Sequence, residues 1–246
     1  MSGANVPLAR GWQAVMLESS VTVRIGPPPP PPAGAVIRTI EAVWEAERAM
    51  RPRLFNGRIF TADRIEPGAV TGHWTEYKRQ LAQIRRPELR EVLALRPLAV
   101  NGLLCCPEGA VLGRRSADAV YLAGDWQATP AGSIEDRGDD QVDLLDQIGA
   151  ELHEELGLDA EAISSVEPVA AVEHAGSRIV DLCFLLWTPL SFDVIFGAQR
   201  RAGNDEYDAL RLVQPDRLDD VLTELGDLLL PSAAILLERW RTAGTR

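Results

Sequence analysis

Three glutamates fall within five positions of the segment GAELHEELGL (residues 149–158): Glu151, Glu154 and Glu155. The nearest cations along the chain are Arg137 and Arg178, so no neighbouring residue neutralises them. Like charges one helical turn apart repel each other by about a few tenths of a kcal/mol in water. A divalent cation would relieve that repulsion, and hard oxygen ligands suit Mg²⁺ or Mn²⁺. The alternative is an acidic, solvated helix face.

Residues 142–156 are predicted to form the helix that positions these carboxylates. At about 100° per residue, Leu145, Ile148, Leu152 and Leu156 fall on one stripe, which we expect to be buried. The three glutamates fall on an adjacent stripe. Gly157 follows the helix and is expected to end it with a left-handed cap.

The loop before this helix, PAGSIEDRGDD (residues 130–140), contains Gly132 and Gly138. Glycine lets the backbone come close to a metal or a phosphate because no side chain intervenes. The segment therefore contains, in this order, a loop, a helix with three carboxylates, a glycine and the apolar Leu158.

That order resembles the Nudix box, Gx5Ex7REUxEExGU, of hydrolases that cleave nucleoside diphosphates linked to another moiety. The resemblance implies an α/β (α+β) fold, a Nudix-type mixed-sheet α/β/α sandwich, for residues 96–246. The positions that match the end of the box are Glu151, Leu152, Glu154, Glu155, Gly157 and Leu158.

Two departures from the box stand out. The interval from Gly132 to Leu158 is four residues longer than the family pattern, so the glutamate of the loop has no secure equivalent. Ala150 replaces the arginine that braces the loop and the carboxylates in the family. All three helix carboxylates are nevertheless present.

The segments IEAVWEAERAMRPRLFNGRIF and WTEYKRQL are similar to the N-terminal region of Nudix enzymes that hydrolyse UDP-glucose and UDP-galactose. Enzymes of that branch also carry a stretched box without the arginine. The resemblance implies Mg²⁺-dependent cleavage, with Mn²⁺ as an alternative, to UMP and a sugar 1-phosphate. Two alternatives are hydrolysis of ADP-ribose or another dinucleotide, and a non-catalytic module that binds a nucleotide or a protein.

The resemblance also implies roles for individual residues. The metal ligands would be Glu151, Glu154 and Glu155, and the base that takes a proton from water would be Glu151 or Glu206. Each assignment has a simpler alternative: a solvated loop acid, a residue that only forms a turn, or a surface arginine. The candidate substrate-binding residues are Gly132, Glu173, His174 and Arg115.

The composition is that of a soluble globular protein. The 246 residues are 46% hydrophobic, and the formal net charge of −11 argues against a nucleic-acid polymer as partner. The sequence shows no signal peptide and no apolar run long enough to span a membrane, so we expect a cytoplasmic protein. The expected partner is a small nucleoside diphosphate sugar, and a homodimer is left open. We expect the three cysteines to be buried free thiols.

The chain is predicted to divide into an N-terminal α/β segment (residues 1–95) and a Nudix hydrolase domain (residues 96–246). In the first segment we expect strands at 21–25 and 58–65, and a helix at 35–50 with Glu47 on its outer face. A second helix is expected at 73–95, interrupted at Pro87. The six prolines that begin at Pro27 form either an exposed loop or a ligand for an SH3-type partner.

Overall fold

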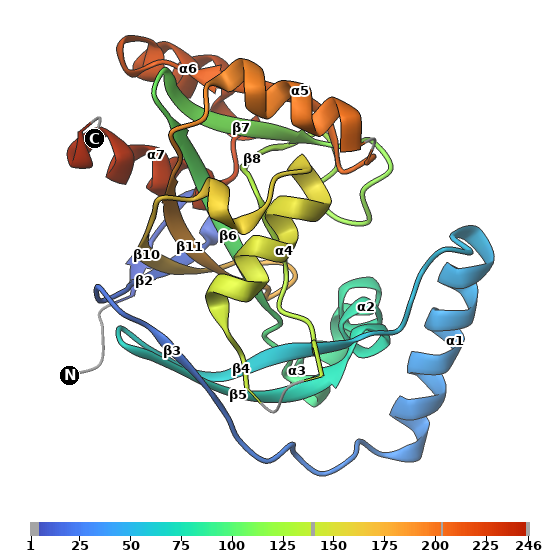
Figure 1. Cartoon of the computed structure of the whole chain (residues 1–246). Coiled ribbons are helices and arrows are strands. Elements are labelled where there is room, and N and C mark those ends of the chain that lie inside the picture. Colours follow the sequence, from blue (N-terminus) through green and yellow to red (C-terminus); the bar gives the residue numbers. More distant parts are fainter. Residues whose placement is uncertain (1–4, 139–140, 203, 245–246) are drawn as a thin grey trace.

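The computed structural model describes residues 5–138, 141–202 and 204–244. It confirms the predicted fold class, because a mixed β-sheet has helices packed on both faces (Figure 1). The order of its principal strands is β1-β2-β10-β11-β6-β7-β12, and β8 and β9 pair with β7 and β6. These strands are β1 (Val6–Pro7), β2 (Gln13–Met16), β6 (Leu98–Cys106), β7 (Gly109–Arg115), β8 (Trp126–Ala128), β9 (Ala131–Ser133), β10 (Ser165–Glu173), β11 (Val180–Trp187) and β12 (Tyr207–Val213).

Helices cover the two faces of this sheet with separate apolar cores. The first core contains α6 (Leu218–Leu225) and α7 (Pro231–Ala243), where Pro231 occupies the first turn. The second core contains α4 (Leu144–Leu156) and α5 (Phe192–Ala202). Strands β6 and β11 are buried along their whole length, which explains their nearly continuous apolar sequences. Their parallel pairing makes the sheet mixed.

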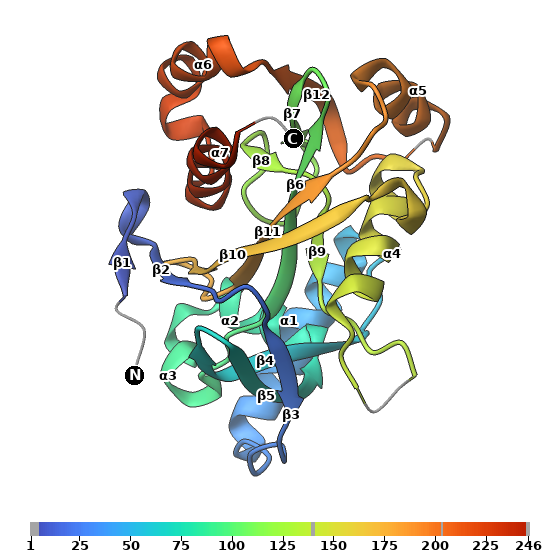
Figure 2. The same ribbon diagram turned by 60° about the vertical axis from the view of Figure 1, so that its left-hand side comes forward.

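A second sheet has the strand order β3-β5-β4 and packs into the same core as α4. Its strands are β3 (Thr22–Ile25), β4 (Arg58–Glu66) and β5 (Ala69–Glu76). Helix α1 (Gly34–Met50) packs against α2 (Tyr77–Arg85), which the 3₁₀ turn Pro87–Leu89 connects to α3 (Arg90–Leu93). Figure 2 shows this layer beneath the main sheet.

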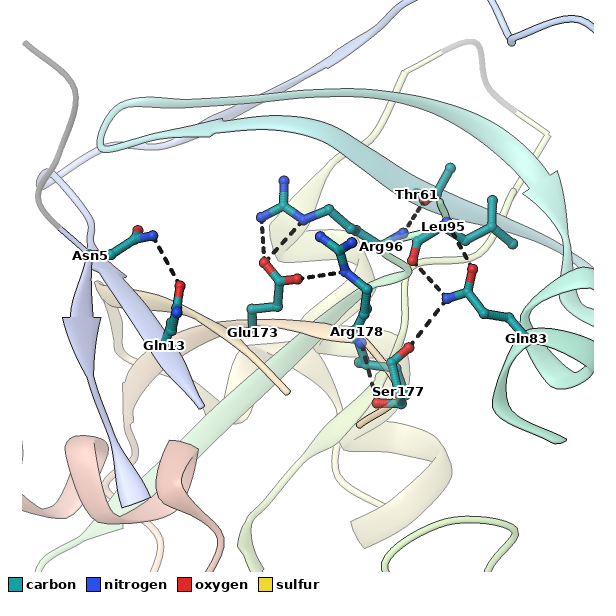
Figure 3. Close-up of polar contacts among 10 residues, drawn as sticks. Asn5, Gln13, Thr61, Gln83, Leu95, Arg96, Glu173, Ser177 and Arg178 are labelled. Atoms are coloured by element: carbon teal, nitrogen blue, oxygen red, sulfur yellow. Dashed lines mark hydrogen bonds and ion pairs between the residues drawn. The ribbon is translucent and has the colours of Figure 1, made fainter. Parts of the chain in front are cut away.

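The junction between the two layers is held by polar contacts (Figure 3). Arg96 and Arg178 converge on the Glu173 carboxylate, with distances of 2.7 Å from Arg96 Nη2 and 3.0 Å from Arg178 Nε. Gln83 binds both backbone groups of Leu95 and donates to the Ser177 carbonyl. Helix α2 is therefore fixed to the turn between β10 and β11.

The structure corrects several local predictions. Residues 73–76 belong to β5, so the second helix begins at Tyr77 rather than at His73. Leu145, in the first turn of α4, is 59% exposed, although Ile148, Leu152 and Leu156 of the same stripe are buried. Glu47 is buried rather than on the outer face, because Arg85 of α2 reaches its carboxylate at 2.6 Å.

The remaining predictions concern the cysteines, membrane spans, the domain division and the proline segment. The three cysteines are buried and free, as expected. In the described part of the chain, no helix is both long and apolar enough to cross a membrane. The division at residue 95 stays a prediction, although β2, from the first segment, pairs with β10 of the second. Pro27 to Pro30 are exposed between β3 and α1. Their role as a ligand for an SH3-type partner stays a prediction.

Candidate active site

Helix α4 is fixed at both ends by its own sequence. At its start, the Asp143 carboxylate accepts hydrogen bonds from the backbone N–H groups of Leu145 and Asp146 at 2.8 and 3.2 Å. At its end, Gly157 adopts φ 63° and donates to the His153 carbonyl, as the predicted left-handed cap requires. These caps set the direction in which the three glutamates leave the helix.

Glu155 is the most buried of the three, with 4% of its surface exposed. Its Oε2 atom accepts hydrogen bonds from the Ala131 N–H at 2.9 Å and the Tyr207 hydroxyl at 2.7 Å. Burial raises the pKa of Glu155 well above its usual value, and the nearby charges of Glu151 and Glu206 raise it further. The hydrogen bond from Tyr207 acts in the opposite direction without cancelling this effect.

Tyr207 belongs to a chain of contacts that crosses the site. Gln127 Nε2 donates to its hydroxyl at 2.9 Å, and Arg115 Nη1 donates to Gln127 Oε1 at 2.9 Å. The same Arg115 nitrogen lies 3.7 Å from Glu206 Oε1. Gly113 makes room for this chain, because a side chain there would overlap the Tyr207 ring. The buried carboxylate of Glu155 is thereby linked to a cation at the rim.

Glu151 lies directly against the backbone of Gly132 in β9. A Cβ atom at position 132 would overlap the Glu151 carboxylate, so a side chain there would displace that carboxylate. Burial, followed by the charges of Glu154 and Glu135, raises the pKa of Glu151 to about 8. The Gly132 backbone thus lies against the Glu151 carboxylate, whereas its predicted approach to a metal or a phosphate stays a prediction.

Glu154 occupies the open side of the cluster. Its side chain is 67% exposed, and its Oε1 atom lies 3.9 Å from Arg137 Nη2, an ion pair at the distance limit. The pKa of Glu135, in the loop before α4, is raised by burial and by the charge of Glu154. Arg137 is therefore a weak counter-ion for several carboxylates.

The three glutamates of α4 line a cavity of about 540 Å³. Among the residues singled out from the sequence, seven line it: Gly132, Glu151, Glu154, Glu155, Arg115, His174 and Glu206. Glu173 does not, because its carboxylate is held by Arg96 and Arg178 at the junction of the layers. The structure thus separates Glu173 from the neighbouring His174.

The donor set suits a divalent cation in its chemistry. Several carboxylates face one cavity, and each raises the pKa of its neighbours, which is the signature of uncompensated negative charge. Within the described ranges, however, no three His, Cys, Asp or Glu side chains already converge as a metal site. Glu155 is turned toward Tyr207 and Ala131, so a cation would have to compete with these donors.

Sequence reasoning missed three residues of the site: Tyr207, Gln127 and Asn101, all of which are buried. The available signal was Gly113, a glycine inside an apolar strand, which indicates close approach of another group. That signal does not say which group approaches, because Tyr207 lies far along the chain.

Comparisons with known proteins give no family assignment. No family model matches the sequence, and no curated protein matches it. Solved structures similar to this chain include the following three. DR0079 from Deinococcus radiodurans has a TM-score of 0.46 and 17% identity, covering 74% of this chain and 98% of its own. The MutT protein from Methanosarcina mazei Go1 has a TM-score of 0.42 and 17% identity, covering 61% and 96%.

The third structure is a NUDIX family hydrolase from Clostridium perfringens, with a TM-score of 0.38 and 12% identity, covering 58% of this chain and 95% of its own. TM-scores of 0.46 and below are too low to carry an argument about family, activity or substrate. The functional conclusion therefore depends on the residues of the site.

Proposed function

We propose that this protein is a divalent-metal-dependent hydrolase of the Nudix type, which cleaves the pyrophosphate of a nucleoside diphosphate derivative. The observation that carries the proposal is the contact between Glu151 and Gly132 beside the buried Glu155. It places uncompensated carboxylates and a glycine backbone on one wall of a cavity. A solvated acidic helix face would have neither the burial nor the cavity.

The protein's own residues would bind and orient the pyrophosphate. Glu151, Glu154 and Glu155 would hold Mg²⁺ or Mn²⁺, which would neutralise the phosphates and polarise the phosphorus under attack. Arg115 is positioned at the rim for a phosphate oxygen, because Gln127 and the Tyr121 carbonyl hold its guanidinium. Tyr207 and the Ala131 N–H hold the Glu155 carboxylate in place.

Two carboxylates are candidates for the base that takes the proton from water. Glu206 is at the rim, with a 43% exposed side chain that lies near Arg115. Glu151 is deeper and lies against Gly132. Glu206→Gln is the clean test, because a variant of the base would lose turnover while retaining nucleotide binding, whereas Glu151→Gln would also remove a proposed metal ligand.

The substrate that we propose first is UDP-glucose or UDP-galactose, on the resemblance of the N-terminal segment. ADP-ribose or another dinucleotide fits the carboxylates and the cavity equally well. A non-catalytic nucleotide- or protein-binding module is the alternative of another class, and Ala150, in place of the box arginine, favours it.

The deciding experiment is a screen of nucleoside diphosphate compounds with Mg²⁺, in which a phosphatase releases phosphate from the products. We expect release from at least one compound, and none with EDTA. UDP-glucose, UDP-galactose and ADP-ribose are the arms that separate the substrate classes. Binding of these compounds without any Mg²⁺-dependent cleavage would refute the hydrolase and support the binding module.

A further inference from the structure

The cavity has a second wall, away from the carboxylates, that is buried and polar yet incompletely hydrogen-bonded. It is formed by α2, β6 and the turn after β10, and we call it the amide wall, after Gln80 and Asn101. Gln80, Asn101 and His174 are 4%, 2% and 4% exposed. Each has one buried polar atom for which the described residues offer no hydrogen-bond partner: Gln80 Oε1, Asn101 Oδ1 and His174 Nδ1.

We propose that the amide wall binds a neutral, hydroxyl-rich group, the sugar attached to the pyrophosphate of the substrate. Most buried polar groups in proteins have hydrogen-bond partners, so three unpaired atoms on residues that line one cavity indicate a missing ligand. The assignment of a pyrophosphate to this ligand rests on the proposed function. The assignment of a sugar is argued from the amide wall itself.

The orientation of Asn101 follows from its neighbours. Its Nδ2 atom donates to Asp181 Oδ2 at 3.1 Å, and a carboxylate only accepts, so Oδ1 is left as an acceptor. Asp181 also accepts from His174 Nε2 at 3.0 Å, which leaves Nδ1 as the unpaired ring nitrogen of His174. The His174 ring is held by stacking on Trp12, with centroids 3.7 Å apart. Both groups are thus preorganised.

Gln80 differs sharply from Gln83, three residues later on the same helix. Both side chains are buried, but Gln83 makes three hydrogen bonds to the backbone of Leu95 and Ser177. Gln80 lines the cavity, and its oxygen has no partner among the described residues. A half-turn of the amide exchanges its oxygen and nitrogen, so either atom can be offered to a ligand. Gln83 is structural, whereas Gln80 is available.

The charges around the cavity exclude a second anionic group at the amide wall. Arg115 is the one Arg or Lys among the described lining residues, and it lies with Glu206 and Gln127. The amide wall instead contains the Asp181 carboxylate, which would repel a phosphate. The group bound here is therefore not an anion, which agrees with a neutral, hydroxyl-rich group.

The placement of the unpaired atoms favours a sugar over a nucleobase. They belong to three different elements, whereas the polar atoms of a base all lie in the plane of its ring. Hydroxyl groups can donate in several directions, which suits amide acceptors. Asn101 also pairs with Ala131, whose N–H binds Glu155, so the amide wall begins one strand away from the carboxylates. A group joined directly to the pyrophosphate would reach it.

The test measures binding rather than cleavage, so its result does not depend on whether the protein is a hydrolase. Dissociation constants are measured by calorimetry with Mg²⁺ for inorganic phosphate, glucose 1-phosphate, galactose 1-phosphate, ribose 5-phosphate, UMP and AMP. We expect at least one sugar phosphate to bind about tenfold more tightly than inorganic phosphate. Comparison of the two hexose phosphates with ribose 5-phosphate shows whether the hydroxyl-rich group is a hexose or a ribose.

The Gln80→Met variant should lose most of that preference and leave the affinity for inorganic phosphate unchanged. Gln83→Met is the matched control: it should lower the melting temperature, whereas Gln80→Met should not. If Gln80→Met does not fold, Gln80→Ala replaces it. The proposal is overturned if no sugar phosphate binds more tightly than inorganic phosphate, or if the preference survives in the Gln80 variant. Weakened binding of UMP or AMP, with sugar phosphates unaffected, would assign the wall to a base and overturn it too.

Discussion

Glu155 and Glu47 are both buried glutamates on helices, yet their surroundings have opposite effects on them. Glu47 lies between Arg85 and Arg51, whose nitrogens approach its carboxylate to 2.6 and 2.5 Å. The hydrogen bond from Arg85 lowers the pKa of Glu47 despite the opposing effect of burial. Glu155 has no such cation, and its pKa is raised. A buried carboxylate with its own arginines is part of the scaffold, whereas one left among other carboxylates is available for a cation.

The strongest test of this contrast is Glu155→Gln. The change preserves the volume and removes one ligand charge, so we expect Mg²⁺-dependent hydrolysis of the best substrate to fall at least about a hundredfold, or ~2.7 kcal/mol of barrier. The melting temperature should hold or rise, because the variant relieves repulsion. Phosphate release and a thermal melt measure the two effects. A variant that turns over at nearly the wild-type rate would remove Glu155 from the site.

The next largest effect concerns UDP, which lacks the terminal sugar of the proposed UDP-sugar substrate. UDP should raise the melting temperature by about 5 °C with Mg²⁺ and by much less with EDTA, because a ligand that binds only the native state stabilises it by mass action. Differential scanning fluorimetry with matched UDP concentrations measures both shifts. Equal shifts would mean that the carboxylates do not bridge a cation to phosphate.

Glu173→Gln tests whether a carboxylate paired with arginines contributes to stability rather than to turnover. Its carboxylate pairs with Arg96 and Arg178 outside the cavity. We expect unfolding to become easier by about 0.5–1 kcal/mol, the usual range for partly exposed ion pairs, with turnover changed less than about twofold. Chemical denaturation and the phosphate-release assay measure these quantities. A large loss of turnover in a stably folded variant would restore Glu173 to the substrate site.

The smallest expected effect concerns Glu47 and pH. A carboxylate whose pKa is lowered by folding stabilises the native state above its unfolded pKa, and this contribution is lost as the pH falls through the folded value. The wild type should therefore lose more stability than Glu47→Gln does as the pH falls below the ordinary carboxyl pKa of 4.5 toward the lower pKa of folded Glu47. Melting temperatures across that range measure the difference. Parallel curves for the two proteins would show that Glu47 contributes no such stability.

The parts of the site that sequence could predict are local in the chain. The glutamates of α4 and the glycine cap follow from spacing within one helix. Burial of Glu47 could not be predicted, because its partner Arg85 comes from another helix. Tyr207 and Gln127 were missed for the same reason. Leu145 was predicted to be buried because periodicity shows which side of a helix is apolar but not at which turn the buried part begins.

Strand β2 is the feature with the widest consequence for how this protein forms. Gln13 at its start pairs with Glu173 at the end of β10, so an edge of the main sheet joins segments far apart in the chain. During synthesis, β2 leaves the ribosome long before its partner exists. The second sheet, β3-β5-β4, has all its strands within residues 22–76 and can pair first. Because Trp12 beside β2 stacks on His174, the ligand cavity takes its final shape only after that late pairing.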